Sequence, residues 1–130
     1  MKTQSEIVIT GLGLVTPLGN DVPTSWDNLV NGKNGIGILE CFDISNFSTK
    51  IGAEVKNFTL DIVDKKSCRR MDRFVQFAIK AAHEAINNSA ISLDDENKTR
   101  IGVIIGAGIG GLRVIEQQHT QLLNGGPSRV

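Results

Sequence analysis

One stretch of the chain, residues 101–112, most strongly limits what the chain can fold into. The β-branched run from Ile101 to Ile105 is followed by four glycines within six residues, and an apolar helical pattern resumes at Leu112. A short run rich in Ile and Val and ended by glycine is typical of a strand buried on both faces. The glycines permit a sharp turn and a close approach to the backbone. The stretch therefore predicts a strand–loop–helix junction, where α/β proteins usually hold their ligands.

The same glycines match the dinucleotide-binding pattern G-x-G-x-x-G, at Gly106, Gly108 and Gly111. That fingerprint also requires an acidic residue about 20 positions further on, at the end of the next strand. The chain after Leu123 reads Asn-Gly-Gly-Pro-Ser-Arg-Val and supplies neither the acid nor the strand. Glu116 lies too early, inside the predicted helix. The sequence therefore disfavours a dinucleotide site.

The remaining chain shows the alternation of strands and helices that defines an α/β protein. A second strand-then-glycine junction lies at its start, where a β-branched run ends in Gly11-Leu12-Gly13. Asn20, Asp21 and Thr24 are all N-cap candidates for the first helix. The predicted elements, in order, are a strand over 7–10, a helix around Trp26 that ends at Gly32, a strand over 51–55, a helix over about 67–87, a strand over 101–105 and a helix from 112 to about 123.

The two predicted parallel strands do not by themselves make a stable core. Strands buried on both faces need neighbouring strands and helices on each side, and a two-stranded sheet is not self-sufficient. A length of 130 residues is compatible with a single domain, but the sequence ends at Val130, where a further strand would be expected. We therefore expect residues 1–130 to be an incomplete domain without an internal boundary, the front part of a larger protein.

Composition excludes several classes of partner. The chain has 14 basic and 14 acidic residues, so no overall charge draws it to nucleic acid or to a membrane surface. No apolar run approaches the roughly 18 residues of a transmembrane helix, and the N-terminus lacks the apolar core of a secretory signal. The two cysteines have no zinc-site spacing. We expect a soluble cytoplasmic protein without a metal site.

A local basic cluster, Lys65, Lys66, Arg69 and Arg70, lies at the predicted start of the long helix. Positive charge at a helix N-terminus opposes the macrodipole, which is already positive there. Such a placement is explained equally well by a solvated helix end and by a surface that receives an anionic partner. The residues alone leave both interpretations open.

The cysteines and histidines do not form a recognisable catalytic pair. A nucleophilic thiol needs a base or a positive field that lowers its pKa. Cys68 lies beside arginines, but both glycine-rich junctions are elsewhere in the sequence, and Cys41 stands alone. His83 and His119 fall on predicted helices without a ligand pattern, so we assign no role to these four residues.

Three motifs in order give the chain a specific resemblance. They are Ile7-Val-Ile-Thr-Gly-Leu-Gly-Leu-Val-Thr-Pro-Leu-Gly-Asn20, Arg69-Arg-Met-Asp-Arg-Phe-Val-Gln-Phe77 and Gly106-Ala-Gly-Ile-Gly-Gly-Leu112. The closing Asn124-Gly-Gly-Pro127 fits as well. Together they resemble the N-terminal part of a β-ketoacyl-acyl carrier protein synthase of the type II, elongating kind, from about Glu6 to the last residue.

The resemblance implies a thiolase-like fold, an α/β/α/β/α layered sandwich, of which this chain would be part of the first half. It implies a homodimer that works in fatty acid biosynthesis without a cofactor. The reaction is a decarboxylative Claisen condensation of an acyl chain with malonyl-acyl carrier protein.

The resemblance places no catalytic residue within this chain. The family's catalytic cysteine and two catalytic histidines match none of residues 1–130, so we expect them to lie beyond Val130. We therefore expect the isolated chain to have no condensing activity.

The resemblance also implies roles for individual residues. Ile109 matches the residue that gates the acyl pocket in the elongating type, and Gly108 precedes it in the same loop. The basic residues that match the surface for the acidic carrier protein are Lys66, Arg69, Arg70 and Arg129. An alternative of another class is a non-catalytic relative that only docks carrier protein or a partner subunit.

Overall fold

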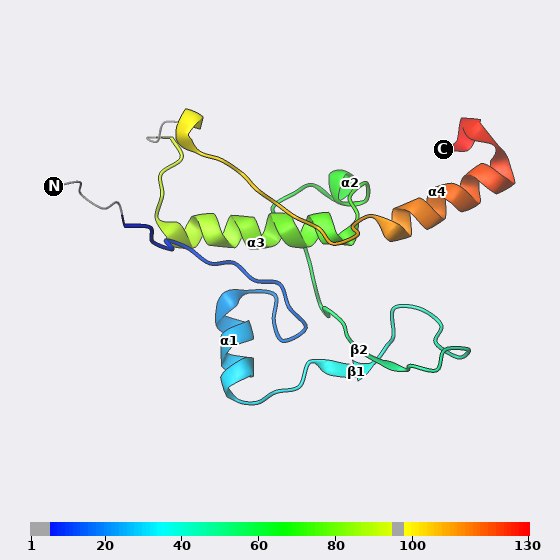
Figure 1. Ribbon diagram of the computed structural model, residues 1–130, viewed down its shortest axis with the longest axis horizontal. Helices are drawn as coiled ribbons and strands as arrows, with labels where there is room; N and C mark the ends of the chain where they lie inside the picture. Colours follow the sequence, from blue (N-terminus) through cyan, green and yellow to red (C-terminus); the bar gives the residue numbers. More distant parts are fainter. Residues whose placement is uncertain (1–5, 95–97) are drawn as a thin grey trace.

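The computed structural model describes residues 6–94 and 98–130, and the chain is open and elongated (Figure 1). The longest helix, α3, lies at the centre of the chain, and the N-terminal segment runs along one side of it. α4 extends beyond the end of α3 that is farther from the N-terminus (Figure 1). The elements are α1 (Val22–Val30), β1 (Ile36–Ile38), β2 (Ile51–Ala53), α2 (Lys65–Cys68), α3 (Arg73–Ser89), η1 (Lys98–Arg100), α4 (Leu112–Gly125) and η2 (Pro127–Arg129).

The N-terminal segment lies directly against the backbone of α3. A Cβ added at Gly13 would lie 1.8 Å from the carbonyl oxygen of Ala81, and one added at Gly11 would lie 2.0 Å from that of Ala85. Real Cβ atoms do not approach backbone so closely, so only glycine fits at these two positions. The first strand-then-glycine junction is therefore required for packing onto a helix.

Glu84 of α3 ties two further parts of the chain to this helix. Its Oε2 accepts a hydrogen bond from the backbone N–H of Leu14 at 2.9 Å, and its Oε1 accepts one from the N–H of Val22 at 2.7 Å. Val22 is the first residue of α1, where backbone N–H groups lack partners within the helix. One carboxylate therefore fixes both the N-terminal segment and the start of α1.

Of the three predicted N-cap residues, Asp21 is the one that caps α1 in the structure. Asp21 has extended backbone angles, and its Oδ1 accepts from the N–H of Thr24 at 2.7 Å, the usual capping bond. Hydrogen bonds from Thr24 lower the pKa of the Asp21 carboxyl. The helix ends at Val30, and Gly32 follows with a φ of +64°, which favours glycine. The predicted helix end is confirmed.

The predicted strand over 51–55 is confirmed as β2, which pairs with β1 in an antiparallel sheet. Ile36 lies opposite Ala53, and Ile38 lies opposite Ile51. The sequence did not locate β1, because a three-residue strand interrupted by Gly37 carries no periodic pattern. Beyond β2, the chain is packed onto α3 by an edge-to-face contact between Phe58 and Phe77, with ring centroids 4.8 Å apart.

The predicted helix over 67–87 is divided in the structure. A short helix, α2, ends at Cys68, and α3 begins at Arg73 and ends at Ser89. Asp72 breaks the helix because its backbone is extended and its carboxylate accepts the N–H of Arg73 at 2.6 Å, as an N-cap. The basic cluster therefore precedes α3, and the expectation that these charges oppose the dipole of the long helix is wrong.

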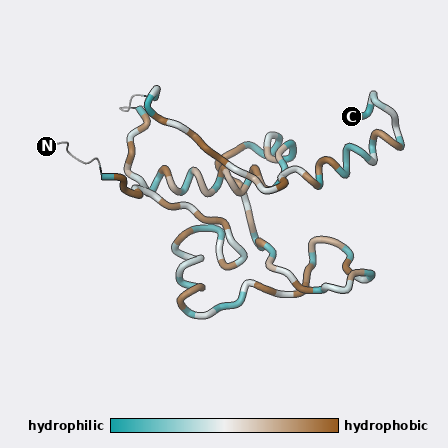
Figure 2. The backbone as a smooth tube through the Cα atoms, in the orientation of Figure 1, coloured by the Kyte–Doolittle hydropathy of each residue, from teal (hydrophilic) through white to brown (hydrophobic). Residues whose placement is uncertain are grey.

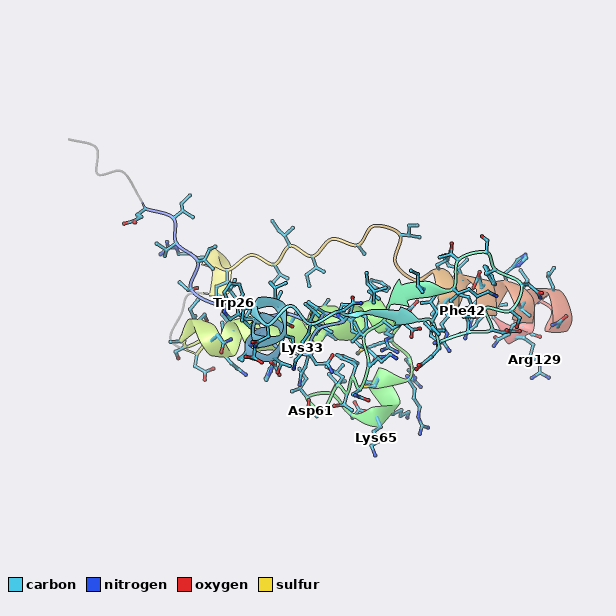
Figure 3. All side chains as sticks on the ribbon, turned by 90° about the horizontal axis from the view of Figure 1, so that it is seen from below. Trp26, Lys33, Phe42, Asp61, Lys65 and Arg129 are labelled. Carbon is cyan, nitrogen blue, oxygen red and sulfur yellow. The ribbon has the colours of Figure 1, made fainter. Side chains whose placement is uncertain are left out.

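The strands predicted over 7–10 and 101–105 are absent from the structure as paired elements. Both segments are extended but unpaired, and Ile7 and Ile104 are 97% and 99% exposed. Figure 2 shows that the segment after η1 is largely apolar, and Figure 3 shows it standing away from α3. A strand is stable only when another strand accepts and donates its backbone hydrogen bonds. The described residues provide no such neighbour, so the expectation of burial on both faces is wrong here.

The described residues hold no buried apolar side chain. The one residue among them that is buried is Ser25, whose hydroxyl donates to the carbonyl of Gly19 at 3.1 Å. None of the helices in residues 6–94 and 98–130 has the length and apolar character needed to cross a membrane. The arrangement is thus held by hydrogen bonds, by close backbone packing and by the ring contact of Phe58 with Phe77 around α3.

Replacing Gly13 by alanine tests the contact with α3. The added Cβ would overlap the carbonyl of Ala81, so we expect the segment to separate from the helix at a cost of about 1–3 kcal/mol. The amide of Leu14 should then exchange with solvent about tenfold faster or more, as followed by NMR. Gly37→Ala is the matched control, since nothing lies within 4 Å of a Cβ there. Unchanged exchange at Leu14 in Gly13→Ala would contradict the prediction.

Candidate functional site

The predicted docking residues Lys66, Arg69 and Arg70 lie together on α2 and the turn that follows it. All three side chains are exposed. Asp64 caps α2, because its Oδ1 accepts from the N–H groups of Lys66 at 3.0 Å and Ser67 at 2.9 Å. Hydrogen bonds from Ser67, first from its side chain and then from its backbone, lower the pKa of the Asp64 carboxyl. The capped turn therefore positions three cations on one surface.

An open cleft of about 450 Å³ lies beside this turn. Four arginines line it: Arg69 and Arg70 from the turn, Arg73 from the first turn of α3, and Arg113 from the first turn of α4. We call this feature the arginine cleft. Its acidic lining residue, Asp72, accepts the N–H of Arg73. The cleft thus gathers a net positive charge from three separate segments of the chain.

The structure does not bring Arg129 to the other docking residues. Arg129 ends η2, at the far end of α4, and Figure 3 shows it well separated from Lys65 of α2. Its side-chain stem packs over Gly125, where an added Cβ would lie 2.6 Å from the Cγ of Arg129. Gly126 has a φ of +73° and turns the chain into η2. Arg129 therefore presents its charge at a second, separate place.

The glycine loop places Ile109 in solvent between α3 and α4. The Ile109 side chain is 82% exposed. Gly110 and Gly111 follow with φ values of +60° and +46°, in the left-handed region that favours glycine. A Cβ at Gly110 would lie 3.1 Å from the Cζ of Phe74, so the loop touches α3 there. At Gly108 a Cβ would meet nothing within 4 Å, so sterics do not require glycine there.

Neither cysteine is in a setting that activates a thiol. The Cys41 side chain hydrogen-bonds to the Glu54 carboxylate, and this bond raises the pKa of the Cys41 thiol. The Cys68 thiol donates to the carbonyl oxygens of Leu60 and Val63 at 3.7 and 3.6 Å. The raised pKa of the Cys41 thiol opposes formation of its reactive thiolate.

The histidines are not arranged around the cysteines. His83 lies on the exposed surface of α3 and interacts with the side-chain amide of Asn87, four residues later on the same helix. His119 is exposed on α4. Within residues 6–94 and 98–130, no group of three or more His, Cys, Asp or Glu side chains is placed to hold a metal ion.

Sequence reasoning missed Arg73 and Arg113 as members of the basic surface. The apolar spacing puts Arg73 on the solvent face of a continuous helix, and Arg113 is a lone cation in the first turn after the glycine loop. Arg73 also donates to the carbonyl of Val55 and lies 5.2 Å from the Phe77 ring centroid. Because the cleft joins segments about 40 residues apart, no local sequence signal could have found it.

The structure resembles a solved ketosynthase. The match is to "The ishigamide ketosynthase/chain length factor", with a TM-score of 0.70 and 23% sequence identity, and it covers 95% of this chain and 31% of that chain. At this identity the likeness concerns the fold alone. The predicted class, part of a thiolase-like α/β fold, is thereby confirmed.

Sequence comparison then gives the family. The model of the "Beta-ketoacyl synthase, N-terminal domain" family matches residues 4–129. Proteins named 3-oxoacyl-[acyl-carrier-protein] synthase 2 are 46% identical over 131 residues in Staphylococcus aureus strain N315 and 46% identical over 127 residues in Synechocystis sp.. The chain belongs to the β-ketoacyl synthase family, as its motifs predicted. The two matches cover 100% and 97% of this chain. The chain itself spans only 32% and 30% of the length of these two relatives.

The cap of α2 should depend on pH. Because the pKa of Asp64 is lower in the folded chain, its stabilising effect is complete above the ordinary aspartate pKa and is lost as the pH falls through the folded value. We therefore expect slow amide exchange at Lys66 and Ser67 above about pH 5 and loss of this protection below about pH 4. An Asp64→Ala variant should lack protection at every pH. Protection that persists in Asp64→Ala would contradict the assignment.

Proposed function

We propose that residues 1–130 are the N-terminal part of a 3-oxoacyl-[acyl-carrier-protein] synthase of the type II, elongating kind. The observation that carries the proposal is the match along the whole chain, at 46% identity, to proteins of that name. The family model, which spans residues 4–129, supports the same conclusion. The chain has no internal domain boundary in this proposal.

The proposed reaction forms one carbon–carbon bond and releases carbon dioxide. An acyl group passes from the carrier-protein thiol to a cysteine of the enzyme. Malonyl-carrier protein then loses carbon dioxide, and the resulting carbanion attacks the acyl thioester and frees the cysteine.

The catalytic residues are proposed to lie beyond Val130. The raised pKa of the Cys41 thiol makes it a poor nucleophile, and the Cys68 thiol faces the carbonyl oxygens of Leu60 and Val63 with no histidine beside it as a base. The relatives named as synthases are about three times as long as this chain, which spans 32% and 30% of them. We therefore assign the catalytic cysteine and both catalytic histidines to the part of the protein that would follow Val130.

Lys66, Arg69 and Arg70 are proposed to receive the acidic carrier protein. Their shared exposed surface supports this role, since complementary charge speeds encounter and fixes orientation. Arg129 is proposed as a further contact, and its separation from α2 means that it touches another part of the carrier protein or acts in another subunit of a homodimer. A cytoplasmic location accords with carrier-protein substrates.

Ile109 is proposed as the gate of the acyl pocket. Its exposed side chain lies between glycines, and the next two residues turn the backbone in the left-handed region without a Cβ. A branched side chain in such a loop can change orientation with little steric hindrance from its neighbours. Gly108 is proposed to supply the same freedom on the other side.

The alternative is a non-catalytic relative that only docks carrier protein or a partner subunit. It rests on the same basic surface and on the unsuitable cysteines of this chain. The two proposals differ in whether the whole protein turns over substrate, and they agree on binding.

Measuring the binding of carrier protein tests the basic surface of Lys66, Arg69 and Arg70, on which both proposals rest. We expect the chain to bind holo-carrier protein by calorimetry, more weakly as the ionic strength rises from about 0.05 to 0.5 M. Replacing Lys66, Arg69 and Arg70 with glutamate should abolish binding, and Arg70→Glu alone should weaken it about tenfold. The matched control is Lys33→Glu, an exposed lysine beyond α1. Binding that is insensitive to salt or to these reversals would exclude the surface.

Turnover of acyl- and malonyl-carrier protein tests the reaction and the gate. The 130-residue chain alone should show none, because it lacks an activated thiol among its described residues. The whole protein should form the 3-oxoacyl product, and Ile109→Phe should slow transfer of long acyl chains to the enzyme more than transfer of acetyl. Absence of turnover by the whole protein would favour the non-catalytic alternative, and equal transfer of both chains would exclude the gate.

A further inference from the structure

The loop that joins β1 to β2, residues 39–50, projects from a stem that is fixed at its base (Figure 1). The backbone N–H of Leu39 donates to the carbonyl oxygen of Lys50 at 3.1 Å and closes the base of the loop. The stem itself is joined to α3, because the guanidinium of Arg73 donates to the carbonyl oxygen of Val55, just after β2. Any movement of this loop therefore takes place above an anchored stem. We call residues 39–50 the β1–β2 loop.

The tip of the β1–β2 loop is held together by contacts of its own. The Asp43 carboxylate accepts hydrogen bonds from the backbone N–H of Ser45, at 3.0 Å, and from its hydroxyl. The Nζ of Lys50 donates to the carbonyl oxygen of Ser45 at 2.8 Å. The rings of Phe42 and Phe47 meet edge to face, with centroids 5.4 Å apart. Because these contacts join residues of the loop to one another, the tip can move as one body.

One carboxylate, that of Glu54, joins the first part of the loop to the end of β2. Its Oε1 accepts from the backbone N–H of Cys41 at 2.9 Å, and its Oε2 accepts from the backbone N–H of Glu40 at 3.1 Å. The Cys41 thiol also hydrogen-bonds to this carboxylate. Hydrogen bonds to an ionised acceptor are stronger than those to a neutral one. The same junction also carries an ion pair between Glu40 and Lys56, at 3.1 Å, whose two side chains are exposed, so it contributes little.

We propose that Glu54 is a latch for the β1–β2 loop: its carboxylate holds the loop closed, and neutralising that carboxylate lets the loop open as one body with its tip still folded. The inference does not depend on the proposed function. In the closed position Cys41 and Phe42 form one side of an open cleft of about 910 Å³, whose other side includes Phe77 and Arg113. Opening of the loop therefore changes access to the first turn of α4.

The latch is closed when Glu54 is ionised. Hydrogen bonds from Cys41, first from its side chain and then from its backbone, lower the pKa of the Glu54 carboxyl. The closed state is therefore stabilised fully above the ordinary glutamate pKa, and this stabilisation is lost as the pH falls through the folded value. The pKa of Asp43 in the tip is lowered too, by hydrogen bonds from Ser45, so acid weakens the tip over a similar range. A substitution at neutral pH isolates the latch. The charged and titratable groups around Glu54 are Glu40, Cys41, Lys56, Asp72, Arg73, Arg113 and Glu116.

Amide exchange at pH 7, followed by NMR, tests the latch. Glu54→Gln keeps the size of the side chain and removes its charge, so exchange at the backbone amides of Glu40 and Cys41 should become about threefold faster. Glu54→Ala removes the acceptor as well, and exchange there should become about tenfold faster. The amide of Ser45 should exchange as before, and the contact between the two phenylalanine rings of the tip should persist in the nuclear Overhauser spectrum.

The Cys41 thiol gives a second, chemical readout of the same latch. While the loop is closed, the hydrogen bond to Glu54 raises the pKa of this thiol and keeps it protonated. Alkylation of Cys41 by iodoacetamide at pH 7 should therefore be severalfold faster in Glu54→Ala, as peptide mass spectrometry will show. Cys68 is the internal control, because its thiol faces the carbonyl oxygens of Leu60 and Val63 and should react at an unchanged rate.

The matched control is Glu40→Gln, which breaks the ion pair with Lys56 but leaves the backbone N–H groups and Glu54 in place, so exchange at Cys41 should stay as it is. Four results would overturn the proposal. Unchanged exchange in Glu54→Ala would show that Glu54 does not hold the loop. Faster exchange that extends to Ser45 would show that the loop unfolds instead of opening as one body. Equal effects of Glu40→Gln and Glu54→Gln would assign closure to the ion pair. Faster alkylation without faster exchange would show that Glu54 acts on the thiol alone.

Discussion

The close contact of Gly11 and Gly13 with the backbone of α3 is the constraint on which the rest of the arrangement depends. It lets an extended segment lie on a helix without side chains between them, so that Glu84 reaches both this segment and the first residue of α1. These hydrogen bonds and glycine contacts orient the elements within the described residues, which contain no buried apolar side chain. The glycines matter here mainly because they have no Cβ, which permits this close contact, and only secondarily because their backbone is flexible.

Local sequence signals were sufficient to predict some helices and strands and insufficient to predict others. The group of N-cap candidates before α1 and the glycines after α1 and α4 located these two helices, since these signals act within one helical turn. The break at Asp72 was missed because apolar spacing continues through Met71 and Phe74, as in an uninterrupted helix. The segment 101–105 has the composition of a strand, but composition cannot supply the neighbouring strand that pairing requires. The basic turn could be predicted, whereas Arg113 joins it only through tertiary structure.

The basic residues lie on two adjoining surfaces, which share Arg69 and Arg70. Lys66 and its neighbours lie on an outward-facing turn, where charge acts over a distance and is screened by salt. The arginines of the cleft face a hollow, where several guanidinium groups can surround one anion.

The left-handed pair Gly110 and Gly111 has a mechanical consequence. The principal contacts of α4 with another element are with η2, so the direction in which α4 leaves the body of the chain is set largely by the dihedral angles of these two residues. The 14 residues of α4 form a rod about 21 Å long. A rotation of about 10° at its base would therefore move Arg129 by about 4 Å while Arg113 stays nearly in place. The dihedral angles of the glycine pair therefore set the position of Arg129 far more than that of Arg113.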